Sequence, residues 1–172
     1  PARASGTPVV TRADRAVVVL VHRHGREAVP TVRSILGSVA PDEVTVLCAR
    51  GTGDVVRAWA TEAAPDIRVR DVDVDDRTAL LAAALDDTDA ETLAIVDAGD
   101  LVDERWLSLA FARASDSGAV VRPADIVTFG RRSGSWSQRP WTGDADTRRA
   151  LALLEVWAGP FAVARSAIAE VA

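Results

Sequence analysis

Two aspartates, Asp97 and Asp100, stand in the turn after a short apolar run, Leu93-Ala94-Ile95-Val96. An unbroken run of this kind is typical of a strand that is buried on both faces, as in a parallel sheet. Ligands of open α/β sheets bind at the carboxyl ends of such strands. Carboxylates placed there suit a hard cation such as Mg²⁺ or Mn²⁺, which also holds substrate phosphates. The alternative is that Asp and Gly simply make the turn and cap the next helix.

A second polar segment, His22-Arg23-His24-Gly25, follows the apolar run Ala16-Val17-Val18-Val19-Leu20-Val21. This run predicts the first strand, so the two imidazoles and the guanidinium are expected at a carboxyl end as well. No set of Cys and His ligands accompanies His22 and His24, which argues against a structural zinc site. The alternative is that these residues belong to a solvated surface loop.

Length and composition narrow the class of protein. A chain of 172 residues, 48% hydrophobic and 26% charged, is expected to form one globular domain. Its net charge of −5 argues against a nucleic-acid partner. The single Cys48 has no internal disulfide partner, which fits a reducing, cytoplasmic location. No apolar run approaches the roughly 18 residues of a membrane span, and no signal peptide is visible.

The remaining pattern alternates between strands and helices. Residues 1–15 have no periodicity and are expected to be a tail or linker. Strands are predicted at 16–21, 44–48, 67–70, 93–96, 119–121, 125–129 and 161–164, and helices at 32–39, 55–63, 77–85, 107–114 and 151–157. Residues 130–146 are expected to be a long irregular loop. This order predicts an α/β fold with a mostly parallel sheet flanked by helices.

Two common nucleotide-binding motifs are missing from this α/β pattern. No GxGxxG follows the first strand, so a dinucleotide-binding domain loses its main support. No GxxxxGK[ST] is present either, which excludes a P-loop.

Several segments in order along the chain resemble the family 2 glycosyltransferases, which have the GT-A fold. His22-Arg23-His24-Gly25 takes the place of the family's "PTYN", and residues 48–53 take that of its "DDGSTD" turn. Residues 93–100 resemble the strand that ends in the metal-binding "DADD", and residues 161–166 resemble "lafrRsal". The resemblance covers residues 16–172. It implies one GT-A-like domain that is truncated at its C-terminal end, because the family's acceptor-side base lies downstream of "Rsal".

The resemblance implies transfer of a sugar from a nucleotide-diphosphate donor to a hydroxyl of a carbohydrate or other acceptor. A divalent cation, Mg²⁺ or Mn²⁺, would stabilise the charge that develops on the leaving diphosphate. The implied metal ligands are Asp97 and Asp100. The residues expected to bind the nucleotide sugar are His22, Arg23, His24, Ala49 and Asp97.

This sequence departs from the family pattern at the site itself. The acidic pair that contacts the base is replaced by Cys48 and Ala49, and the third position of the metal motif is Gly99, which leaves Asp100 to compensate. The "ARN" helix start reads Thr78-Ala79-Leu80-Leu81. The second hypothesis is therefore a non-catalytic GT-A-like domain that serves as an assembly or carbohydrate-binding module. A third hypothesis is a nucleotidyltransferase, which would also use a divalent metal held by carboxylates. Such an enzyme normally has a Gly-rich basic loop after the first strand, which Arg23-His24-Gly25-Arg26 resembles only weakly.

The predicted loop contains further candidates. Trp136 and Trp141 lie among arginines and would either stack on a sugar or pack the loop down. Asp144 and Asp146 are the acidic residues nearest to an acceptor side, but the sequence assigns no catalytic base.

Overall fold

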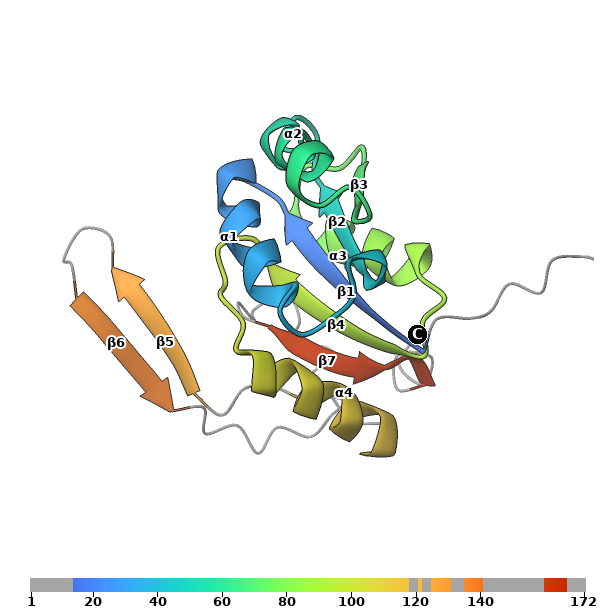
Figure 1. Ribbon diagram of the computed structural model, residues 1–172, viewed down its shortest axis with the longest axis vertical. Coiled ribbons are helices and arrows are strands. Elements are labelled where there is room, and N and C mark those ends of the chain that lie inside the picture. The colour runs from blue at the N-terminus through green and yellow to red at the C-terminus, as the bar shows by residue number, and fades with distance from the viewer. Residues whose placement is uncertain (1–13, 118–120, 122–124, 131–134, 141–159, 167–172) are drawn as a thin grey trace, which may run out of the picture.

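The computed structural model describes residues 14–117, 121, 125–130, 135–140 and 160–166 of the chain. Its centre is a five-stranded sheet in the order β3-β2-β1-β4-β7, in which only the β4–β7 pair is antiparallel (Figure 1). The strands of this sheet are β1 (Arg15–Val21), β2 (Val44–Cys48), β3 (Arg68–Asp71), β4 (Thr92–Asp97) and β7 (Phe161–Ala164). The mostly parallel α/β sheet predicted from the sequence is thus confirmed.

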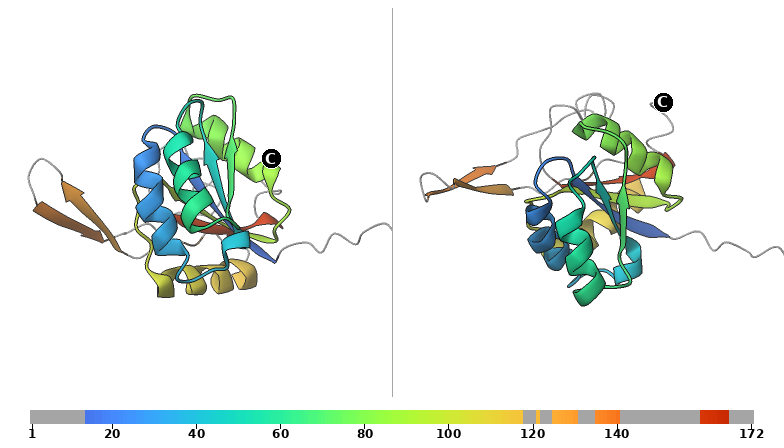
Figure 2. Two further views of the ribbon diagram at one scale, coloured as in Figure 1. Left: turned by 45° about the horizontal axis from the view of Figure 1, so that its top comes forward. Right: turned by 90° about the horizontal axis from the view of Figure 1, so that it is seen from above.

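Helices cover both faces of the sheet. The helices are α1 (Gly25–Ile35), α2 (Asp54–Ala63), α3 (Arg77–Asp87) and α4 (Glu104–Ser117), with a 3₁₀ turn η1 at Pro41–Glu43. Helix α3 lies on one face, and α1, α2 and α4 lie on the other (Figure 2). None of the helices in the described part of the chain is long and apolar enough to cross a membrane.

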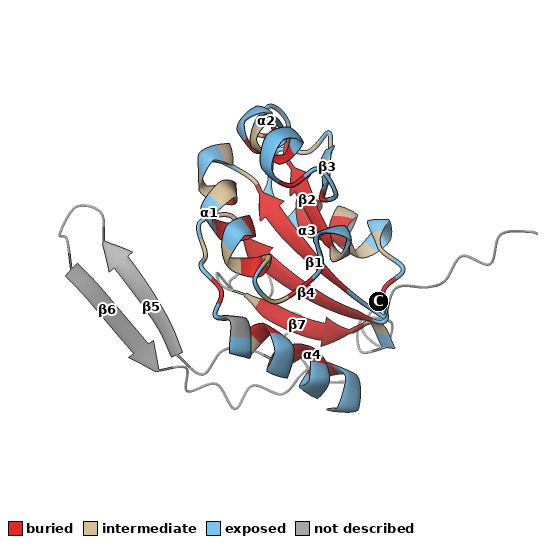
Figure 3. Ribbon diagram, viewed as in Figure 1, coloured by how far each residue is buried: buried red, intermediate tan, exposed pale blue. Residues whose placement is uncertain are grey.

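The core follows the two-residue period of the strands. Val17, Val19 and Val21 of β1 face α1, α2 and α4, whereas Val18 and Leu20 face α3. All five side chains are buried, as are most residues of β2, β4 and β7 (Figure 3). A strand with apolar residues on both sides is stable only between two layers of helices, which explains the unbroken apolar runs.

The order of the strands places one crevice at the centre of the sheet. The chain moves outward from β1 to β2 and β3, and then returns through α3 to β4 on the other side of β1. The carboxyl ends of β1 and β4 therefore lie side by side at the point where the strand order reverses. Open α/β sheets bind their ligands at this position.

Some predicted boundaries differ from the structure. Helix α1 ends at Ile35 rather than reaching Val39, because the chain tightens into a turn in which the amide of Ser38 donates to the carbonyl of Ile35. Val39 is buried all the same, which accounts for its place in the apolar stripe. The first strand begins at Arg15, one residue earlier than expected.

The predicted loop at 130–146 is wrong in part. Ser135–Pro140 forms strand β6, which pairs antiparallel with β5 (Asp125–Gly130), and Trp136 therefore lies on a strand. This hairpin projects to one side of the main sheet (Figure 1). Strand β6 lies outside the central sheet and pairs with β5, so its sequence does not need the apolar run that a strand buried on both faces shows. Trp141, Asp144, Asp146 and the helix predicted at 151–157 lie outside the described residues.

Candidate functional site

The turn at residues 97–100, here named the β4 turn, is held in place by helix α1. The amide of Gly99 donates to Oγ1 of Thr31 at 2.9 Å, and the amide of Val102 donates to Oγ of Ser34 at 3.1 Å. Each hydroxyl also donates to a carbonyl within α1, which fixes its direction. The polar face of α1 thus anchors the loop that leads from β4 to α4.

Gly99 is required by the shape of this turn. Its φ of +105° is a conformation that residues with a side chain rarely adopt. A Cβ at this position would also lie 3.2 Å from Oε2 of Glu27, a residue of the first turn of α1. The backbone therefore disfavours the family's third-position carboxylate, and the Glu27 carboxylate lies beside the position that it would occupy.

Asp97 ends β4 and forms an ion pair with Arg77, the first residue of α3. Nε of Arg77 lies 2.8 Å and 3.0 Å from the two carboxylate oxygens, and Nη2 lies 2.8 Å from Oδ2. The two side chains are only 18% and 12% exposed. Asp76 caps α3 by accepting from the amide of Ala79 and so fixes the helix start that carries Arg77. This pair is more enclosed than the ion pairs of Arg15, Arg50, Arg57 and Arg70.

Asp100 is the second carboxylate of the β4 turn. Its Oδ2 is buried and has no hydrogen-bond partner. Burial, and then the nearby negative charge of Asp97, raises the pKa of Asp100 from 3.8 to about 6. Solvent does not reach this oxygen, so it is not open to a ligand that approaches from the strand ends.

These side chains form a poor donor set for a divalent cation. Within the described residues, no three His, Cys, Asp or Glu side chains gather closely enough to hold a metal ion. The guanidinium of Arg77 already engages both oxygens of Asp97. Mg²⁺ needs a near-octahedral shell of oxygens, with one or two open carboxylates and substrate phosphates. The predicted metal ligands Asp97 and Asp100 therefore stay a prediction, and any cation would have to displace Arg77.

The turns after β1 and β2 approach each other closely and line an open pocket of about 570 Å³. Gly25 faces the carbonyl of Thr52 so tightly that a Cβ would clash with it. The Thr52 hydroxyl in turn lies 2.9 Å from the carbonyl oxygen of Val21, which ties the two turns together. The pocket is lined by Arg23, His24, Gly25, Arg26, Glu27, Gly51, Thr52, Asp54 and Val55.

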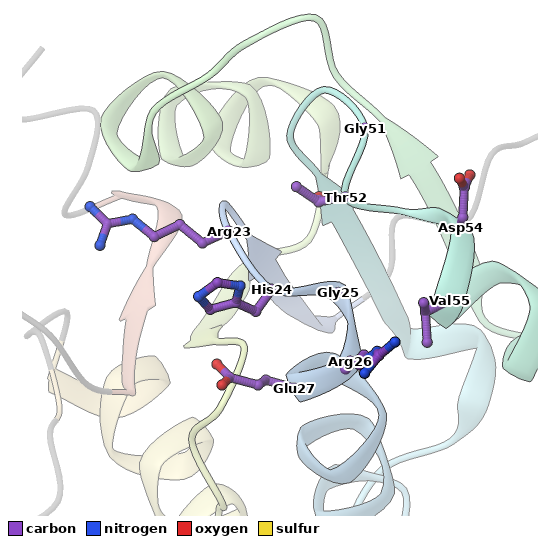
Figure 4. A pocket seen from close by; sticks show the side chains of 9 residues that line it. All are labelled: Arg23, His24, Gly25, Arg26, Glu27, Gly51, Thr52, Asp54 and Val55. Atoms are coloured by element: carbon purple, nitrogen blue, oxygen red, sulfur yellow. The ribbon is translucent and has the colours of Figure 1, made fainter. Parts of the chain in front are cut away.

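The side chains of this pocket point in two directions. Arg23, His24 and Glu27 extend to one side of the loop at Gly25, whereas Arg26 extends to the other, toward Val55 (Figure 4). Within this group, Glu27 lies beside Gly99 of the β4 turn. Arg23 and His24 are exposed and bring cationic and hydrogen-bonding groups to the mouth of the crevice.

The other residues predicted to bind the nucleotide are less exposed to solvent than Arg23 and His24. His22 is half-buried, and Ala49 is 2% exposed beneath the turn after β2. The neighbouring Cys48 is fully buried, and burial raises the pKa of its thiol from 9.0 to about 11. The end of β2 therefore presents no carboxylate, and the assignment of these residues to a nucleotide stays a prediction.

Sequence reasoning missed Arg77 and Glu27. Both stand in the first turn of a helix that follows a strand of the parallel sheet. Such helix starts lie at the same edge of the sheet as the strand ends, which is the signal that could have identified them. Nothing in the sequence indicates that Arg77 and Asp97, which are twenty residues apart, form a pair.

Comparison with known proteins finds likeness in structure only. No protein-family model matches the chain, and no curated protein matches its sequence. Among solved structures, the mannosyltransferase PcManGT of Pyrobaculum calidifontis, in complex with GDP-Man and Mn²⁺, matches with a TM-score of 0.52 and 22% identity. That match covers 67% of this chain and 37% of the mannosyltransferase.

Two further structures show the same likeness. Mannose-1-phosphate geranyltransferase from Thermus thermophilus has a TM-score of 0.52 and 19% identity over 91% of this chain and 59% of that one. TarS 1-349 of S. aureus, in complex with UDP-GlcNAc, has a TM-score of 0.50 and 16% identity over 62% of this chain and 33% of that one. This chain thus spans between about a third and three fifths of the matched proteins.

Similarities at these identities establish the fold. The chain has a GT-A-like fold, a mostly parallel five-stranded sheet flanked by helices, as the sequence predicted. Its membership of glycosyltransferase family 2 in particular stays a prediction.

Proposed function

We propose that this chain is the donor-binding domain of a nucleotide-sugar transferase, which moves a sugar from a nucleotide-diphosphate donor to an acceptor hydroxyl. The observation that carries the proposal is the crevice where the strand order reverses. It lies between the carboxyl ends of β1 and β4. Arg23 and His24, which follow β1, line the pocket beside it. Two of the matched structures contain GDP-Man and UDP-GlcNAc, which supports a donor of this class.

The chemistry of such a transfer calls for positive charge in this place. When the bond between the sugar and the diphosphate breaks, negative charge develops on the leaving nucleoside diphosphate. Fixed cations and helix N-termini near the leaving oxygens stabilise that charge. Arg23 and the N-terminus of α1 line the pocket beside this point and are groups of this chain that can serve that purpose.

A divalent cation was expected at Asp97 and Asp100 and would supply further positive charge to the diphosphate. One matched structure contains Mn²⁺. In this chain the cation would compete with Arg77 for both oxygens of Asp97. The acceptor and the base that would deprotonate it stay unassigned, because the candidates Asp144 and Asp146 lie outside the described residues.

Calorimetric titration with UDP, GDP and their sugar derivatives tests the proposal. We expect one nucleotide class to bind the wild-type chain. Arg23→Gln should weaken that binding about tenfold, since a charge-assisted hydrogen bond contributes about 1.5–3 kcal/mol. Arg68→Gln removes an equal charge at the start of β3, at the opposite edge of the sheet, and serves as the matched control, with a change below about twofold. Failure of every nucleotide to bind a folded protein would contradict the proposal.

A second candidate function is a GT-A-like domain without transferase activity. The end of β2 favours it, because the family's base-contacting acids are here the buried Cys48 and Ala49. This candidate predicts that neither nucleoside diphosphates nor nucleotide sugars bind. The same titration therefore separates the two functions.

A further inference from the structure

The fork of Arg77 occupies the atoms that a metal ion would need. Nε and Nη2 reach both oxygens of Asp97 at 2.8–3.0 Å in a largely enclosed place. A planar guanidinium matches a carboxylate in this two-point manner, and removing one partner of such an enclosed pair leaves the other charge without compensation. A divalent cation that binds Asp97 must first separate this pair.

The rest of the β4 turn offers a metal no compensation. Gly99 stands where the family has a carboxylate, and its positive φ disfavours one. Oδ2 of Asp100 is not accessible from solvent. The positive charge that is seated on this turn is therefore the guanidinium of Arg77.

We propose that Arg77 is the fixed cation of this site, standing at Asp97 in place of a divalent metal, so that the crevice binds nucleoside diphosphates without Mg²⁺ or Mn²⁺. This inference rests on the proposed function only for its ligand. Arginine stays protonated at all ordinary pH values and is not removed by chelators. Its single charge is smaller than that of a metal ion, but it is fixed by the fold and needs no second component.

Manganese binding in the absence of nucleotide tests the inference independently of the proposed function. Electron paramagnetic resonance of free Mn²⁺ measures it directly. We expect the wild-type chain to leave one equivalent of Mn²⁺ unbound. Arg77→Gln opens both oxygens of Asp97 and should bind Mn²⁺ at least tenfold more tightly than the wild type. Adding Asp97→Asn to that variant should abolish the gain.

Two controls keep these results interpretable. Arg70→Gln breaks another Arg–Asp pair, with Asp87 at the far end of α3, and should leave Mn²⁺ unbound. If Arg77→Gln does not fold, Arg77→Lys retains the charge without the fork and should show an intermediate gain in Mn²⁺ affinity. Wild-type protein that binds one Mn²⁺ through Asp97 overturns the inference. So does a folded Arg77 variant that gains no affinity for Mn²⁺, because the fork then excludes nothing.

The second test measures the affinity for the nucleoside diphosphate with and without a divalent metal. We expect the affinity of the wild type for its nucleoside diphosphate to change less than twofold between EDTA and Mn²⁺. An affinity that collapses in EDTA overturns the inference and leaves the proposed function standing. If no nucleotide binds at all, the proposed function fails, and the manganese measurement alone decides the role of Arg77.

Discussion

The turns after β2 and β4 flank the same strand, β1, yet they handle charge in opposite ways. Each turn contains a glycine with positive φ, Gly51 at +72° and Gly99 at +105°. After β2, the strand end is apolar, and Arg50 pairs with Asp73 and Asp75 in solvent. After β4, the carboxylate itself is buried and paired. The ion pairs of the turn after β2 are exposed to solvent, whereas the ion pair of the turn after β4 is largely enclosed.

This difference indicates which half of the candidate donor site keeps its polar chemistry. A base next to β2 would meet Cys48 and Ala49, which offer no carboxylate. A diphosphate next to β4 would meet a region whose charges are held in a defined geometry. The two halves therefore differ in kind, and each can be perturbed without the other.

The largest expected effect comes from breaking the enclosed pair. Arg77→Ala leaves Asp97 as an unpaired, largely buried charge and should lower the free energy of unfolding by about 2–4 kcal/mol. Arg50→Ala removes a solvent-exposed pair and should cost less than about 1 kcal/mol. Denaturant unfolding followed by circular dichroism measures both. Equal losses would show that the two turns do not differ in the way described.

The next effect concerns the two glycines. Gly99→Asp restores the family's acid but forces a side chain into a positive φ beside the Glu27 carboxylate, and should destabilise the fold by about 2–3 kcal/mol. Gly51→Asp is the matched control, because it has open space and a left-handed φ that Asp tolerates. By the same denaturant unfolding it should cost about 1 kcal/mol. A stable Gly99→Asp protein that gains Mn²⁺ binding would contradict this account of the turn.

The smallest effect depends on pH. The pKa of Asp100 is raised to about 6, so the folded state holds its proton more tightly than the unfolded chain does. The stability that this contributes is present below about pH 4 and is lost as the pH rises through about 6. Asp100→Asn removes the loss and should stabilise the protein by about 1–2 kcal/mol at pH 8, with no gain near pH 4, when unfolding is measured at both values. A gain that does not vary with pH would rule out this cause.

The sequence predicts the sheet well because burial is a local signal in β1, β2 and β4. Each is an apolar run that only a two-sided cover of helices explains. The N-cap of α4 was also predictable, since Asp103 accepts from the amides of Arg105 and Trp106. The cap of α2 was not, because Thr52 bonds to carbonyls of the β1 and β2 ends instead.

The strands that carry the candidate residues were predictable from the sequence, whereas the contacts between these residues were not. The candidate residues were expected at the carboxyl ends of two strands, and the structure shows that these strands, β1 and β4, are neighbours. The pairing of Arg77 with Asp97 depends on where α3 starts relative to β4, and no periodicity records that. In the sequence, Gly99 is interpreted as the loss of a metal ligand. In the structure, its positive φ shows that the turn has a conformation that favours glycine.

Amide chemical-shift mapping with a nucleotide sugar in EDTA tests the central claim most directly. We predict that shifts concentrate at the carboxyl ends of β1 and β4, at His22, Arg23, His24, Ala98 and Gly99. The opposite edge of the sheet, at Asp42 and Ala90, should stay unchanged. Shifts at that opposite edge, or none with any nucleotide sugar, would contradict a donor site in the crevice between β1 and β4.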